Sequence, residues 1–172
     1  MKNHYLLLIL LFCITTSISA QEVLEDAKLK FDLPNEHWKF AEKIDNKNVI
    51  VYTYKRDYIV DSMGRKIDPQ ISFILEPVDS SISVIQYSTI KRVKLPFEVV
   101  TMFTHEDGMM KFENGIGYQG KYVDQGLEHR IYLVHGINNN MGITVVMDTT
   151  EELAHIVAPE FLKSLRSFDS YE

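Results

Sequence analysis

The chain has 172 residues, 45% of them hydrophobic, and a formal net charge of −6. This hydrophobic fraction excludes a disordered chain, and the acidic balance offers no basic surface of the kind that binds nucleic acid. The length fits one ordinary domain with a full core. Composition therefore indicates a single folded acidic domain.

The first 20 residues have the anatomy of a secretory signal. Lys2 gives the start a positive charge, an apolar run covers residues 6–14, and small residues end the segment at Ala20. An uncleaved anchor would need roughly 20 apolar residues to cross a bilayer, so cleavage fits better. We predict a signal peptide over residues 1–20, cleavage after Ala20, and an exported protein that is periplasmic or secreted.

Cys13 is the only cysteine of the chain. It lies inside the apolar run and follows Phe12, where lipoprotein processing needs a small residue, so we expect no lipidation. Cleavage after Ala20 leaves residues 21–172 without a thiol, which excludes disulfides, thiolate metal ligands and cysteine nucleophiles. No later stretch has 18 unbroken apolar residues, so we expect no transmembrane helix in the mature chain.

Alternating patterns predict strands in the first half of the mature chain. Residues 31–33 form a short strand that ends in a turn, and residues 38–44 can pair back with it. Residues 48–54 place apolar or aromatic side chains on both faces, which is typical of a strand in the interior of a sheet. Residues 70–78 form the next strand, and the two make a hairpin with a long, charged, exposed turn.

A helix is predicted over residues 82–93. Ser80 and Ser81 are its candidate N-caps, although its many β-branched residues disfavour a helix. The expected apolar stripe consists of Ile82, Ile85, Thr89 and Val93. Cations near its end (Lys91, Arg92, Lys94) resemble a basic patch, but the simpler interpretation is a favourable interaction with the helix dipole.

The second half of the mature chain reads as a strand meander followed by a closing helix. Short Gly- and Asn-rich connectors join alternating runs, which indicates antiparallel pairing. Thr149 and Glu152 fit a capping box, residues 153–168 have helical spacing, and Pro159 should kink or restart that helix. The predicted fold class is α+β, an antiparallel meander covered by helices. Its strands are expected at residues 97–104, 115–123, 127–135 and 142–148.

Several short segments follow this layout across residues 29–168. Phe31-Asp32-Leu33-Pro34 precedes Trp38, a hairpin is followed by one helix, and the closing helix ends in Phe161-Leu162-Lys163-Ser164-Leu165. With this layout the chain resembles the PsbP/Mog1-like superfamily. Residues 60–65, 105–108 and 117–120 are similar to a group of exported bacterial PsbP-related proteins without an assigned activity.

The resemblance implies an αβα sandwich and a binding or assembly role. Proteins of the superfamily are non-catalytic accessory subunits or binding proteins: extrinsic photosystem factors in one branch and a nuclear-transport regulator in another. No catalytic motif is carried over to this chain.

His105, Glu106 and Asp107 form the densest polar cluster of the sequence. A histidine beside two carboxylates can seat a cation or work as an acid–base pair, whereas the following Gly108 is typical of an exposed turn. His129 and His135 share one face of a strand but lie roughly 20 Å apart, too far to hold one metal ion together. Contact of either with His105 or His155 across the fold stays open.

The sequence lacks the common motifs of hydrolases and of nucleotide-binding proteins. The chain has no Gly-X-Ser-X-Gly motif and no phosphate-binding loop before a helix. The glycine run over residues 115–120 leads into a strand, so its glycines are better explained by close packing. Tyr118 and Tyr132, with other strand tyrosines, either share a ligand surface or belong to the core and its rim.

We therefore predict an exported, non-catalytic binding or accessory protein without a cofactor or metal, which recognises a protein partner or a small ligand. The alternatives are a metal-assisted enzyme centred on the cluster at residues 105–107, with a further histidine brought near by folding, and a structural envelope protein. Candidate binding residues are His105, Glu106, Asp107, His129, His135, Tyr118 and Tyr132.

Overall fold

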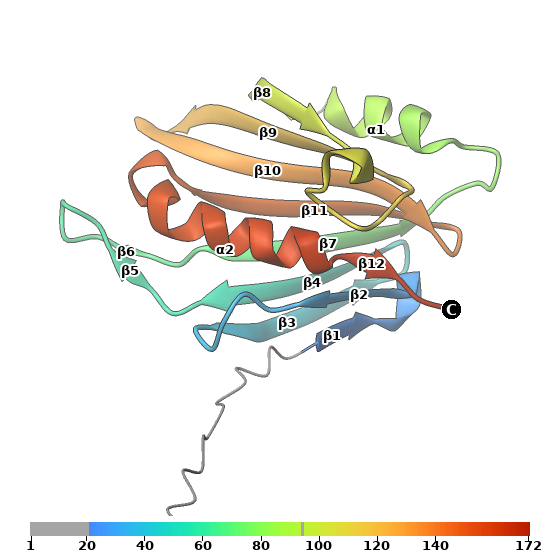
Figure 1. Ribbon diagram of the computed structural model, residues 1–172, viewed down its shortest axis with the longest axis horizontal. Coiled ribbons are helices and arrows are strands. Elements are labelled where there is room, and N and C mark those ends of the chain that lie inside the picture. The colour runs from blue at the N-terminus through green and yellow to red at the C-terminus, as the bar shows by residue number, and fades with distance from the viewer. Residues whose placement is uncertain (1–20, 94) are drawn as a thin grey trace, which may run out of the picture.

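A seven-stranded antiparallel sheet forms the centre of the computed structural model, which describes residues 21–93 and 95–172 (Figure 1). The strand order is β3-β4-β7-β11-β10-β9-β8. The predicted signal peptide and Cys13 lie outside the described residues, and so does Lys94. The strands of this sheet are β3 (Trp38–Asn46), β4 (Val49–Arg56), β7 (Gln70–Pro77), β8 (Glu98–Phe103), β9 (Gly115–Asp124), β10 (Leu127–Asn138) and β11 (Met141–Thr150).

The local alternation of side chains explains most of these strands. β4 lies inside the sheet and pairs antiparallel with β7, so both the interior strand and the hairpin are confirmed. The long connection between them contains a small hairpin of its own, β5 (Ile59–Val60) with β6 (Lys66–Ile67). β9, β10 and β11 form the predicted meander. Its turns place Gly126 and Asn140 at positive φ, where Gly and Asn are favoured.

One face of the sheet is covered by α2 (Ala154–Ser167) and by a small sheet of β1 (Gln21–Leu24), β2 (Leu29–Asp32) and β12 (Asp169–Ser170). A short 3-10 helix, η1 (Glu25–Ala27), links β1 to β2. The core lies between these layers, and its aromatic side chains pack edge to face or tilted, as for Phe31 on Tyr54 and Trp38 on Phe161. The architecture is α+β, as predicted.

The prediction that residues 38–44 pair back with the first strand is wrong. β3 pairs with β4, whereas β2 pairs with β1 and β12. Alternation identifies a strand and its faces, but it does not identify the partner when several strands compete. The β2 partners come from residues 21–24 and from the last residues of the chain.

The opposite face of the sheet carries α1 (Val84–Arg92), which packs on β9 and β10. Its cap is Ser83 in a capping box with Gln86, so the prediction of Ser80 or Ser81 is wrong. The predicted apolar stripe is also wrong, since Ile85 is 66% and Val93 is 83% exposed. The buried side chains are Tyr87 and Ser88. They face the sheet because its surface there is polar, as described below.

The start of the last helix also differs from the prediction. Thr149 belongs to β11, and its hydroxyl has no hydrogen-bond partner, so the capping box with Glu152 is wrong. A 3-10 turn, η3 (Glu151–Leu153), leads into α2 instead, and α2 continues through Pro159 as one helix. No helix within residues 21–93 and 95–172 is long and apolar enough to cross a bilayer.

The glycine run of β9 serves close packing. A Cβ atom at Gly117 would lie 2.0 Å from the ring of Phe103, and one at Gly120 would lie 2.2 Å from the ring of Phe97. Only glycine lets these rings lie directly on the backbone of β9. The packing interpretation of this run, in place of a dinucleotide fingerprint, agrees with these contacts.

Candidate ligand-binding site

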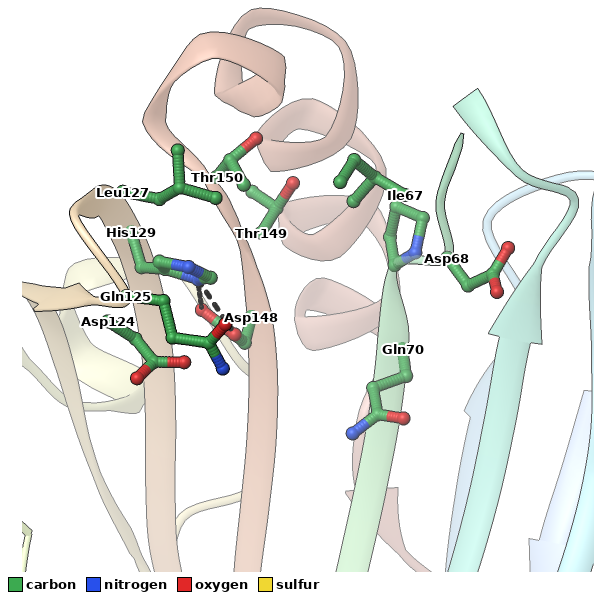
Figure 2. Close-up of a pocket in the computed structure, with 11 residues that line it drawn as sticks. Ile67, Asp68, Gln70, Asp124, Gln125, Leu127, His129, Asp148, Thr149 and Thr150 are labelled. Atoms are coloured by element: carbon green, nitrogen blue, oxygen red, sulfur yellow. Dashed lines mark hydrogen bonds and ion pairs between the residues drawn. The ribbon is translucent and has the colours of Figure 1, made fainter. Parts of the chain in front are cut away.

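A pocket of about 310 Å³ opens at one end of the sheet, where β7 and β10 begin and β11 ends (Figure 2). We call it the strand-end pocket. One wall comes from the β6–β7 segment and the other from the β9–β10 turn, with the end of β11 between them. Its lining residues are Ile67, Asp68, Pro69, Gln70, Asp124, Gln125, Leu127, His129, Asp148, Thr149 and Thr150.

Two side chains fix the position of the Asp148 carboxylate in the strand-end pocket. Its Oδ2 accepts a hydrogen bond from the hydroxyl of Tyr122 at 2.8 Å, and Nδ1 of His129 lies 3.1 Å from the same oxygen. The rings of Tyr122 and His129 stack with centroids 4.8 Å apart. Strand register produces this arrangement, because His129 pairs with Tyr122 on β9 and lies diagonal to Asp148 on β11.

Burial dominates the electrostatics of Asp148. It raises the pKa of this carboxyl above its usual value, although Tyr122 and His129 lower it in part by stabilising the charged form. The side chain is 27% exposed and therefore keeps contact with the pocket. The pKa of Tyr122 is also raised, by burial and by its bond to Asp148, so its hydroxyl stays a donor.

Two threonine hydroxyls of the pocket wall have no hydrogen-bond partner. Thr149 is 3% and Thr150 is 5% exposed, and neither Oγ1 atom bonds to any described group. Figure 2 shows both side chains between His129 on one wall and Ile67 on the other. An unsatisfied buried hydroxyl costs about 1–3 kcal/mol. Both oxygens are almost inaccessible, so they add no polar surface to the pocket.

The cluster predicted at residues 105–107 is an exposed 3-10 turn, η2 (His105–Asp107). Asp107 accepts a hydrogen bond from the backbone N–H of Thr104 at 2.7 Å, and Gly108 has a positive φ of 69°. Both features are typical of an exposed turn, as the sequence analysis also proposed. None of the three predicted residues lines the strand-end pocket.

His135 and Tyr118 come together beneath α1. The hydroxyl of Ser88 lies 3.0 Å from Nδ1 of His135 and 2.7 Å from the hydroxyl of Tyr118. Next to them, the hydroxyl of Tyr87 lies 3.2 Å from that of Thr144. This closed polar cluster, with His135 completely buried, explains why α1 turns its polar side to the sheet.

The other predicted binding residues, and His155, lie in different parts of the fold. Tyr132 lies on the opposite face, where its ring packs against Phe161 in the core. His129 is the one predicted binding residue that lines the strand-end pocket. His155 bonds to the backbone of Glu152. Within the part of the chain that the structure describes, no three His, Asp or Glu side chains group closely enough to hold a metal ion.

Asp148 and the two threonine hydroxyls were missed by sequence reasoning, and Tyr122 was considered only among the strand tyrosines. The two-residue turn at Gln125 and Gly126 signals the contact of Tyr122, because it fixes the β9–β10 register and pairs Tyr122 with His129. The next turn, at residues 139–140, places Asp148 diagonal to His129 in the same way. The unpaired hydroxyls depend on packing that no local pattern reveals.

No protein-family model matches the chain, and no curated protein matches it significantly. Similar solved structures are Mog1p, a Ran-binding protein of Saccharomyces cerevisiae, and the cyanobacterial PsbP of Synechocystis. Mog1p is 10% identical to this chain, with a TM-score of 0.54; the match covers 87% of this chain and 94% of Mog1p. The PsbP is 16% identical, with a TM-score of 0.53; the match covers 92% of this chain and 96% of the PsbP.

LpqN of Mycobacterium tuberculosis, described as involved in cell envelope biogenesis, has 12% identity and a TM-score of 0.60. The match covers 90% of this chain and 91% of LpqN. A structure from Bacteroides thetaiotaomicron has 9% identity and a TM-score of 0.52, and this chain spans about half (49%) of its length. Identities this low concern the fold alone. The sequence-based resemblance is confirmed at that level: the chain has the fold of the PsbP/Mog1-like superfamily.

Proposed function

We propose that this chain is an exported, non-catalytic binding protein that holds a small polar ligand in the strand-end pocket. The observation that carries the proposal is the Asp148 carboxylate, fixed by Tyr122 and His129 at the wall of a 310 Å³ pocket. Ligand pockets are concave, with volumes of about 300–1,000 Å³ and a few polar groups that converge. This pocket is at the small end of that range, which favours a small ligand.

The position of the pocket also supports binding. Its walls come from the ends of β7, β10 and β11, so a rigid sheet holds the polar groups while two connecting segments border the opening. Sites built on sheet strands hold their side chains more firmly than sites on loops alone. Of the predicted binding residues, His129 is the one that lines this pocket.

Amide NMR of the mature chain tests this proposal. We expect that, in a panel of small amines, carboxylic acids, polyols and nucleosides, at least one compound shifts the resonances of Gln125, His129 and Asp148. The matched variant Asp148→Asn should weaken the shifts for that compound. If every compound leaves these resonances unmoved, or moves only residues elsewhere in the chain, the proposed function is wrong.

Export is part of the same proposal. It rests on the basic start, the apolar run and the small residues that precede Gln21. The involvement of LpqN in cell envelope biogenesis is compatible with this location. We expect the protein recovered from bacterial envelope or medium to resist labelling by a maleimide, because Cys13 is its only thiol. Labelling of the exported form would show that the leader is retained, and recovery from cytosol alone would contradict export.

A further inference from the structure

We infer that the outward face of α1 is a docking surface for a second copy of this chain, and that two α1 helices pair antiparallel there. This surface is separate from the strand-end pocket, whose lining contains no residue of α1. α1 lies at the margin of the fold (Figure 1), and Tyr87 and Ser88 hold its inner side to the sheet. Its opposite side therefore faces solvent.

The apolar side chains of α1 gather on this outward side. Ile85 is 66%, Ile90 is 53% and Val93 is 83% exposed, and Ile82 in the preceding turn is partly exposed. Single apolar side chains on a surface need no explanation, but these four lie together along one helix. Polar contacts with three strands fix the orientation of α1, so this apolar stripe stays outside in the single chain. A fixed, exposed apolar stripe is typical of an interaction site.

A shallow groove of about 370 Å³ on this face has the geometry that accepts another helix. Rows of side chains four residues apart form the ridges of an α-helix, and the groove between two such rows receives a ridge of a second helix. A flat lipid surface has no ridge of this kind. The lining residues form two rows with this spacing, Ser81, Ile85 and Thr89 in one and Ile82, Gln86 and Ile90 in the other.

The outward face of α1 is complementary to itself when the second copy runs antiparallel. A two-fold axis midway between residues 86 and 89 places Ile85 of one copy opposite Ile90 of the other, and Gln86 opposite Thr89. Oε1 of Gln86 already accepts from the backbone N–H of Ser83 at 2.9 Å, which leaves its amide N–H groups to donate. Thr89 donates its hydroxyl to the carbonyl of Ile85, so its oxygen can still accept. The pairing therefore joins apolar to apolar and donor to acceptor.

Charges at the two ends of α1 favour the same arrangement. Asp79 is exposed before the helix, and Arg92 is its last residue. Among the described residues, Arg92 lies over the rings of Phe97 and Tyr118, at 4.6 and 5.6 Å, and pairs with no carboxylate. Antiparallel pairing brings Arg92 of each copy toward Asp79 of the other, whereas parallel pairing brings like charges together. An anionic lipid surface would attract Arg92 but repel Asp79, so the charges favour a second copy.

The length of α1 determines how strong the dimer can be. Its nine residues span about 13.5 Å, too short to bury the roughly 800 Å² per partner of a standard interface. We therefore expect a reversible dimer with a dissociation constant of about 10–100 µM. Sedimentation velocity of the mature chain from about 5 to about 500 µM should show a monomer–dimer equilibrium that depends on concentration.

Matched variants locate the interface. Ile85→Asp should raise the dissociation constant at least about tenfold, because the dimer would then bury two unpaired carboxylates. Val123→Asp adds the same charge at a side chain of similar exposure, 67%, on β9 and outside the groove, so it should leave the dimer unchanged. If Ile85→Asp alters the amide spectrum beyond α1, Ile90→Asp is the second variant and should act in the same direction.

Charge reversal tests the orientation of the two helices. Asp79→Arg and Arg92→Asp should each weaken the dimer, and the double variant should bind more tightly than either single one, because opposite charges face each other again. A double variant no tighter than the single ones would overturn the antiparallel pairing.

Three other outcomes would overturn the inference. They are a monomer at every concentration, even one that binds anionic vesicles through Ile85; a dimer that Ile85→Asp and Ile90→Asp leave intact; and equal weakening by Val123→Asp, which would report added charge and not the interface.

Discussion

Replacing Glu160 with alanine is expected to lower the free energy of unfolding by about 3 kcal/mol. Glu160 lies on α2 and accepts hydrogen bonds from Nε1 of Trp38 at 2.8 Å, from Nε of Arg56 at 2.9 Å and from the amide of Asn35 at 2.9 Å. Burial raises the pKa of Glu160, but these donors outweigh it and the net direction is down. Its removal leaves Arg56, with a side chain 12% exposed, as an unpaired charge.

The control is Glu151→Ala, which breaks the ion pair of Arg130. Both of those side chains are more than a quarter exposed, so the expected cost is about 1 kcal/mol or less. Urea unfolding of the two variants measures the difference. Because replacing both partners of a buried pair is cheaper than removing one, Arg56→Met should cost less in the Glu160→Ala background than alone. Equal destabilisation by Glu160→Ala and Glu151→Ala would contradict this account.

Acid is expected to destabilise the protein through His135. Burial, together with the positive charges of Lys91 and Arg92, lowers the pKa of His135 from 6.5 to about 4. Because the unfolded chain binds a proton at His135 more readily than the folded chain does, stability falls as the pH drops from 6.5 toward 4. The shift corresponds to a loss of about 3 kcal/mol near pH 4 relative to neutral pH.

His135→Gln isolates this effect from the other titrating groups. The glutamine amide can still bond to Ser88, but it does not titrate, so the variant lacks the loss caused by His135. Urea unfolding of both proteins at neutral pH and near the folded pKa of about 4 gives the comparison. We expect the wild-type protein to lose about 3 kcal/mol more than the variant over this interval. Parallel pH dependences of the two proteins would show that His135 is not held in its neutral form.

The meander of β9, β10 and β11 could be predicted because its information is local. Alternating side chains mark each strand, and two-residue turns of Gly and Asn set the register between neighbours. The same reasoning succeeds for β4 with β7, despite the long connection between them. It fails for β2, which pairs with its sequence neighbour β1 and with the distant β12 rather than with β3.

α1 shows why burial was harder to predict than helix formation. The stripe through Ile85 and Val93 has helical spacing, but the helix faces the sheet with Tyr87 and Ser88. The deciding contacts come from His135, Tyr118 and Thr144 on three other strands. A pattern within one helix cannot report the polarity of the surface beneath it.

The candidate site also depends on contacts between separate strands. His129 was identified from its residue type, whereas Asp148 becomes relevant only through the register of β10 with β11. Thr149 was assigned to a helix cap, a role that its place in β11 excludes. Residues 105–107 are adjacent polar residues in the sequence, but they form a turn in which the Asp107 carboxylate accepts a hydrogen bond from the backbone of Thr104.

The most direct test is a crystal structure of the mature chain with the tightest-binding compound of the panel. The account predicts density for that compound within the strand-end pocket, with a donor at hydrogen-bond distance from the carboxylate of Asp148. An empty strand-end pocket, with the same compound bound at another surface of the chain, would contradict it.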